Sequence, residues 1–78
     1  MKITNVIRAL AKHAGMSMYD VSRALDHAPA WAGVVAGREG VALATIADVA
    51  DVAGCDVVIR DRATGDDVGV IEPPRRCE

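Results

Sequence analysis

The 78-residue chain has no phenylalanine, one tryptophan and one tyrosine, so few large side chains are available to build a hydrophobic core. Hydrophobic residues still make up 51% of the chain, but many are small, with 14 alanines and 11 valines. Burying alanine stabilises a fold much less than burying leucine or phenylalanine, and a domain this short buries a modest share of its surface. We therefore predict a single domain that gains stability as a homodimer.

Cysteines and long apolar runs are also scarce. The two cysteines, Cys55 and Cys77, are too few for a disulfide framework or a zinc site, and we interpret them as a half-buried thiol and a tail thiol without a function. No apolar run approaches the ~20 residues of a membrane span. Arg8 and Lys12 interrupt the apolar N-terminal stretch, which is not typical of a secretion signal. These absences favour a cytoplasmic protein.

The residue groupings that catalysis or metal binding requires are missing as well. His13 and His27 lack a metal-ligand spacing. The GREG segment at residues 37–40 follows no predicted strand and is too short for a phosphate-binding loop. Ser17 is better explained as a helix cap than as a nucleophile. We expect no catalytic residue, no metal, no cofactor and no enzymatic activity.

The net charge of −2 argues against general nucleic-acid binding, but the charge is unevenly distributed. Residues 1–40 carry a net charge of +2, whereas residues 41–78 carry −4. A half that contacts DNA, joined to an acidic half that mediates assembly, would have this distribution. An ordinary solvated surface would have it too, so the charge distribution alone does not distinguish a DNA-binding protein from one without that function.

Apolar residues recur at helical spacing through most of the first two thirds of the chain. Gly15 and Gly54 are typical of helix ends, Ser17 is typical of a helix start, and Pro29 suits the first turn of a helix. The predicted helices cover residues 3–14, 17–25, 28–37 and 43–53.

The pattern then changes to that of strands. Two β-branched runs, CDVVIRD and DVGVI, are joined by a short loop that contains Gly65, which predicts a hairpin over residues 55–72. A two-stranded hairpin is marginally stable alone, so its apolar side chains need cover from the helical domain at residues 1–54 or from a second copy. Residues 73–78 are predicted to be a flexible tail. The residues predicted to mediate dimerisation are Val57, Ile59, Val68 and Val70.

The predicted helices at 17–25 and 28–37, with a connection of two or three residues, form the pair in which the second helix enters the major groove of DNA. The segment MSMYDVSRALDHAPAWAGVVAGREGVALATIADVADVAGCDVVI resembles the Cro/lambda-repressor-like (xenobiotic-response-element type) helix-turn-helix family. The resemblance lies in the serine-capped second helix, in APAW at the start of the third, and in TIADVADVAG before a strand. CDVVIRDRATGDDVGVI is similar to the strand-turn-strand extension of small regulators of that group.

The resemblance covers residues 3–71 approximately and implies a mainly α fold, a four-helix lambda-repressor-like helix-turn-helix domain with a C-terminal β-hairpin. It implies a homodimeric, sequence-specific regulator of transcription, of the repressor or antitoxin type, that binds double-stranded DNA. Ala32, Val35 and Ala36 would point inward. The residues that would contact DNA are Ser17, Tyr19, Arg23, His27, Pro29, Ala30, Trp31, Gly33, Val34 and Arg38.

The chain departs from the family pattern in three places. Asp26 stands where a glycine is usual, and it would have to adopt the left-handed conformation. Ala28 stands where serine or threonine usually caps the third helix. The groove-facing positions are apolar, so they offer no bidentate contact to guanine or adenine. The alternative function is therefore protein–protein interaction through the apolar face of helix 28–37, without DNA binding.

Several of these residues also have a purely structural interpretation. Trp31 is as consistent with partial burial as with DNA contact. His27 suits a turn, and Arg38 suits a solvated loop. Arg23 has Asp20 and Asp26 three residues away on either side, and such pairs contribute a few tenths of a kcal/mol.

Overall fold

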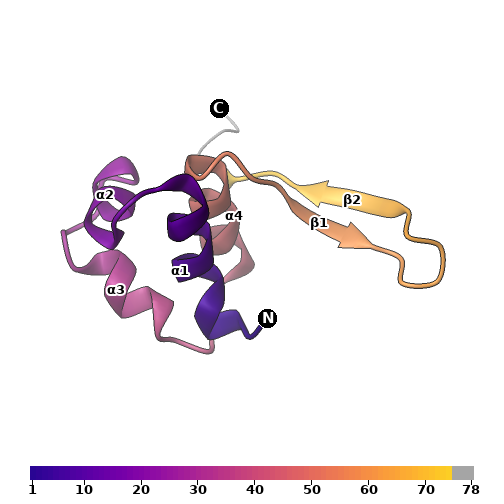
Figure 1. Ribbon diagram of the computed structural model, residues 1–78, viewed down its shortest axis with the longest axis horizontal. Helices are drawn as coiled ribbons and strands as arrows, with labels where there is room; N and C mark the ends of the chain where they lie inside the picture. Colours follow the sequence, from indigo (N-terminus) through magenta and orange to yellow (C-terminus); the bar gives the residue numbers. More distant parts are fainter. Residues whose placement is uncertain (75–78) are drawn as a thin grey trace.

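The structure, a computed structural model, describes residues 1–74 and shows four helices followed by an antiparallel hairpin (Figure 1). This arrangement confirms the predicted mainly α class with a C-terminal hairpin. Cys77 and most of the predicted tail lie outside the described residues. The elements are α1 (Ile3–Ala14), α2 (Met18–Ala24), α3 (Trp31–Ala36), α4 (Leu43–Val52), β1 (Val57–Arg60) and β2 (Asp67–Ile71).

The ends of α1 and the start of α2 follow from local sequence. Gly15 has φ of 69°, the left-handed conformation that glycine adopts readily. Its N–H donates to the Lys12 carbonyl at 3.1 Å, which closes the last turn of α1. Ser17 then begins α2 with a capping box: its Oγ accepts the Asp20 N–H, and its own N–H donates to the Asp20 carboxylate, each at 3.0 Å.

The connection between α2 and α3 is longer than predicted, and α3 is shorter. Residues 25–30 join the two helices, and α3 has 6 residues. Pro29 and Ala30 form a tight turn, in which the Trp31 N–H donates to the Ala28 carbonyl at 2.9 Å. The α-helical pattern starts only with the bond from the Val34 N–H to the Ala30 carbonyl, at 3.1 Å. The cap position is therefore Ala30, not Ala28.

Small apolar side chains fill the core, as the composition predicts. In Figure 1, α1 lies between α4 on one side and the α2–α3 pair on the other, and it contacts all three. The inward half of α3 is buried as predicted. The core residues are Ile7, Ala11, Val21, Leu25, Ala32, Val35, Ala36 and Val49.

The hairpin stands off from the helices as an arm, here defined as residues 57–71 (Figure 1). Only Val57 and Ile71 at its base are half-buried, and residues 58–70 are exposed. The expected cover by the helical domain is therefore limited to the base, because the arm extends along the long axis of the molecule. Pro73, placed in the flexible tail by the sequence, is buried.

The residues predicted for dimerisation do not share one face of the arm. Ile59 lies opposite Gly69, whereas Val70 lies opposite Val58. Because side chains alternate along a strand, Ile59 and Val70 are on opposite faces. Val68 is the extra residue of a bulge and has no cross-strand partner in the register. Val58, which the prediction left out, shares a face with Val70.

Within residues 1–74, no helix has the length and apolar character needed to cross a membrane. Cys55 is a half-buried free thiol, as expected, and its Sγ lies 3.7 Å from the Ala53 carbonyl oxygen.

Candidate nucleic-acid interface

The turn after α2 is built on Asp26. Its φ is +59°, the one positive value among the non-glycine residues that the structure describes, so the predicted left-handed conformation is confirmed. The Asp26 N–H donates to the Arg23 carbonyl at 3.1 Å, and the His27 N–H donates to the Ser22 carbonyl at 2.9 Å. These two bonds form a Schellman motif. They end α2 and fix the direction in which His27 leaves it.

Ser22 connects α2 to α3 and was missed by the sequence prediction. Its side chain is fully buried, with 0% exposure. The Oγ donates to the Met18 carbonyl at 3.0 Å and accepts the Ala32 N–H at 2.9 Å. Ala32 is in the first turn of α3, whose N–H groups have no partner within the helix. Ser22 thus supplies from a neighbouring helix the acceptor that Ala28 and Ala30 lack.

His27 and Trp31 form a stacked pair at the start of α3. The ring centroids are 3.9 Å apart, and the ring planes differ by 5°. Trp31 is half-buried and also packs against the core. The structure therefore supports the packing interpretation of Trp31 and brings it together with His27, which the sequence treated separately.

Tyr19 and Arg23, both exposed on α2, form a second pair. The Arg23 Nη1 donates to the Tyr19 hydroxyl at 3.0 Å, and the guanidinium carbon lies 5.7 Å from the centre of the ring. This distance permits a cation–π contact. The phenol holds the guanidinium at the surface of the last helical turn of α2, just before the connection to α3.

The start of α2 is less suited to a phosphate than the sequence indicates. Both the Oγ and the N–H of Ser17 are used in the capping box. The Asp20 carboxylate therefore occupies the position where a phosphate would approach, and like charges repel. The predicted DNA contact of Ser17 stays a prediction, and we assign no phosphate site there.

The outer face of α3, defined to include the turn before the helix, consists of Pro29, Ala30, Trp31, Gly33 and Val34. Pro29, Ala30 and Val34 are exposed, and Val34 has an exposed fraction of 55%. A Cβ added at Gly33 would meet no atom within 4 Å. This face bears no charged or amide side chain.

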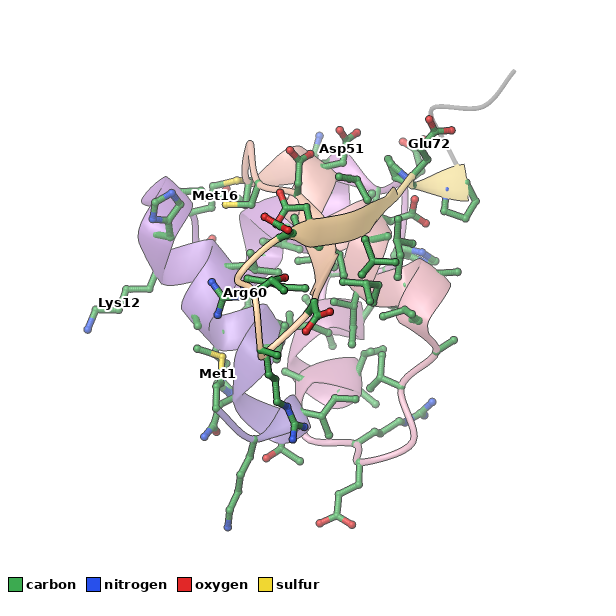
Figure 2. All side chains as sticks on the ribbon, turned by 90° about the vertical axis from the view of Figure 1, so that its right-hand side faces the viewer. Met1, Lys12, Met16, Asp51, Arg60 and Glu72 are labelled. Carbon is green, nitrogen blue, oxygen red and sulfur yellow. The ribbon has the colours of Figure 1, made fainter. Side chains whose placement is uncertain are left out.

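Polar groups lie at the two ends of this outer face. His27 stacks on Trp31 at its start. Arg38 follows α3 and is exposed, and its N–H donates to the Val35 carbonyl at 3.0 Å. Lys12 is a further cation, and Figure 2 shows it extending from α1 into solvent. His27 and Arg38 therefore flank the apolar face, one at each end, rather than lying on it.

No match to the chain is found among protein-family models, curated proteins or solved structures. Membership of the Cro/lambda-repressor-like family therefore stays a prediction. Within residues 1–74, no group of three or more histidine, cysteine or acidic side chains is placed to hold a metal ion. The candidate site thus depends on the geometry of α2, the Asp26 turn and α3.

Proposed function

We propose that the chain is a homodimeric, sequence-specific regulator that binds double-stranded DNA, with α2 and α3 acting as a helix-turn-helix unit. The observation that carries the proposal is the presentation of α3. The buried bond from the Ala32 N–H to Ser22 Oγ holds the inner half against α2, while the outer face is open to solvent. In Figure 1, α3 lies at the end of the molecule away from the arm. A helix held in this way suits insertion into a major groove.

The outer face of α3 would read DNA mainly by shape and apolar contact. Its small side chains, Ala30 and Gly33 among them, let the backbone approach the base edges closely. Val34 is exposed enough to contact a thymine methyl group. Specificity then depends on the methyl pattern and on the deformability of the duplex.

The polar groups around that face would supply affinity and orientation. Arg38 would bind a phosphate beyond the end of α3, and Arg23 would contact the backbone from α2. The imidazole of His27 offers a hydrogen-bond donor beside Trp31. Contacts with phosphates contribute most of the affinity in such interfaces.

The proposal is tested by selecting from a random pool of duplexes at low salt with the full chain. We expect enrichment of a two-fold symmetric site, because a symmetric dimer binds two half-sites separated by a whole number of helical turns. Arg38→Gln should weaken binding uniformly across sequences, and Val34→Ala should change the preferred base. A pool in which no duplex is enriched would contradict the proposal.

The second candidate function is protein–protein interaction through the same outer face. It is favoured by the 55% exposure of Val34 and by the absence of charged side chains from this face. An apolar contact keeps or gains strength as a salting-out salt is added, whereas phosphate contacts weaken. The salt dependence of binding therefore separates the two functions.

A further inference from the structure

We infer that two copies of the chain join through the free edge of β1, antiparallel and centred on Val58, to form a four-stranded sheet. The inference specifies the dimer that the proposed function requires. It depends on the backbone geometry of the arm and on the order of charges along β1, neither of which involves DNA.

The backbone groups of β1 point alternately toward β2 and away from it. The Asp61 N–H donates to the Asp66 carbonyl at 2.9 Å, so the peptide groups of Asp61 face β2. In an antiparallel ladder the N–H and C=O of every second residue point to the same side. Ile59 and Val57 therefore also face β2, and those of Val58 and Arg60 form the free edge.

Two copies of this edge match when the two-fold axis passes through Val58. In that register Asp56 lies opposite Arg60 of the second copy, and Val57 lies opposite Ile59 of the second copy. Val58 pairs with its own equivalent. Every pair is then either oppositely charged or apolar, and both kinds stabilise a sheet. Moving the axis by one residue to Ile59 places Val58 opposite Arg60 and loses this match.

The edge of β2 does not offer the same match. Between residues 66 and 72 there are three acidic side chains, Asp66, Asp67 and Glu72, and no basic one. A two-fold axis through Gly69, for example, would place Asp66 opposite Glu72 of the second copy. The bulge at Val68 also twists this edge, which discourages pairing.

Pairing through β1 would cover apolar surface that the single chain exposes. Val58 and Ile59 have exposed fractions of 39% and 50% and lie on opposite faces of the arm. A second hairpin adjoining β1 extends both faces, so that Ile59 gains an apolar neighbour on one and Val58 on the other. A sheet of four strands is also more stable than an isolated pair.

The first test compares Val58→Pro with Val70→Pro in the full chain by sedimentation without DNA. The two valines are cross-strand partners, and each points its N–H toward a free edge. Proline removes that N–H and is tolerated at such positions. We expect Val58→Pro to be monomeric and Val70→Pro to remain dimeric. The inference is overturned if the wild type is monomeric, if the two variants have the same oligomeric state, or if only Val70→Pro is monomeric.

A second test keeps the backbone and changes the charges. Asp56→Arg places arginines opposite each other in the dimer, and Arg60→Asp places acids opposite each other. Each variant alone should dimerise more weakly than wild type, and mixing them should give a heterodimer about tenfold tighter than either homodimer. Native mass spectrometry separates these species by mass. Mixing that yields no preferred heterodimer would overturn the register.

Both tests are read without DNA, so they are separate from the test of DNA binding. A chain that pairs through β1 but enriches no duplex would contradict the proposed function alone. A chain that enriches a symmetric duplex while Val58→Pro remains dimeric would contradict the β1 edge alone.

Discussion

At the scale of single residues, Ser22 joins α2 to α3 through its hydroxyl group. It donates one hydrogen bond within α2 and accepts another from Ala32, with no exposure to water. A buried amide that loses its acceptor destabilises the fold by about 1–3 kcal/mol. The side chain therefore controls both the stability of the helical domain and the position of α3.

We predict that Ser22→Ala lowers the free energy of unfolding by about 1–3 kcal/mol, because the Ala32 N–H is left buried without a partner. Ser17→Ala is the matched control, since it removes an exposed cap worth about 1 kcal/mol. In Ser22→Ala, hydrogen exchange of the Ala32 amide should accelerate far more than the loss of global stability explains. In Ser17→Ala, it should accelerate only as much as the loss of global stability explains. Unchanged protection of that amide in Ser22→Ala would refute the role assigned to the hydroxyl.

His27 provides a second prediction at this scale. Its imidazole covers one face of Trp31, the only tryptophan, so indole fluorescence reports directly on the stack. We expect His27→Ala to increase quenching of the tryptophan by acrylamide, while His13→Ala on α1 leaves the quenching unchanged. Equal quenching in the two variants would mean that the stack does not shield the indole.

At the scale of elements, the sequence predicts what depends on local signals. Gly15 as a helix end, Ser17 as a helix start and the left-handed Asp26 all act within one or two turns of the chain, and they are found as expected. The start of α3 could not be predicted in the same way. It depends on Ser22, whose acceptor reaches a residue 10 positions later, across the interface between two helices.

The six residues of α3 are too few for an independent helix. A serine between the apolar positions Val21 and Leu25 was the one available signal that something polar lies in the core. The same limit applies to the arm: alternation identifies two strands, but it does not reveal which residues face each other when a bulge shifts the register. Val58 was missed for that reason.

Gly33 permits stability and binding to be separated within α3. Replacing glycine by alanine inside a helix stabilises it by about 0.5–1 kcal/mol, and the added Cβ meets no atom within 4 Å. We predict that Gly33→Ala raises the melting temperature but weakens binding to the enriched duplex, because the methyl group lies on the outer face. If Gly33→Ala is more stable than wild type and has the same affinity for DNA, the DNA does not contact this face of α3.

At the scale of the whole molecule, the two proposed interfaces are on different elements, α3 and the arm. In Figure 1, α3 lies at the end of the molecule away from the exposed arm. The charge asymmetry follows this division in part, with +2 in residues 1–40 and −4 in residues 41–78. Arg60, labelled on the arm in Figure 2, is an exception, and in the inferred dimer it would lie opposite Asp56 of the second copy. The arm would therefore set the spacing between the two α3 helices.

The proposed binding of DNA by α3 and its flanking cations is tested by measuring the affinity of the full chain for the enriched duplex as a function of salt concentration. We predict a linear fall of log K with log salt, with a slope near −0.9 for each phosphate contact, and a slope smaller by about one for Arg38→Gln. An affinity that stays constant or increases with salt would contradict DNA binding and favour an apolar protein contact.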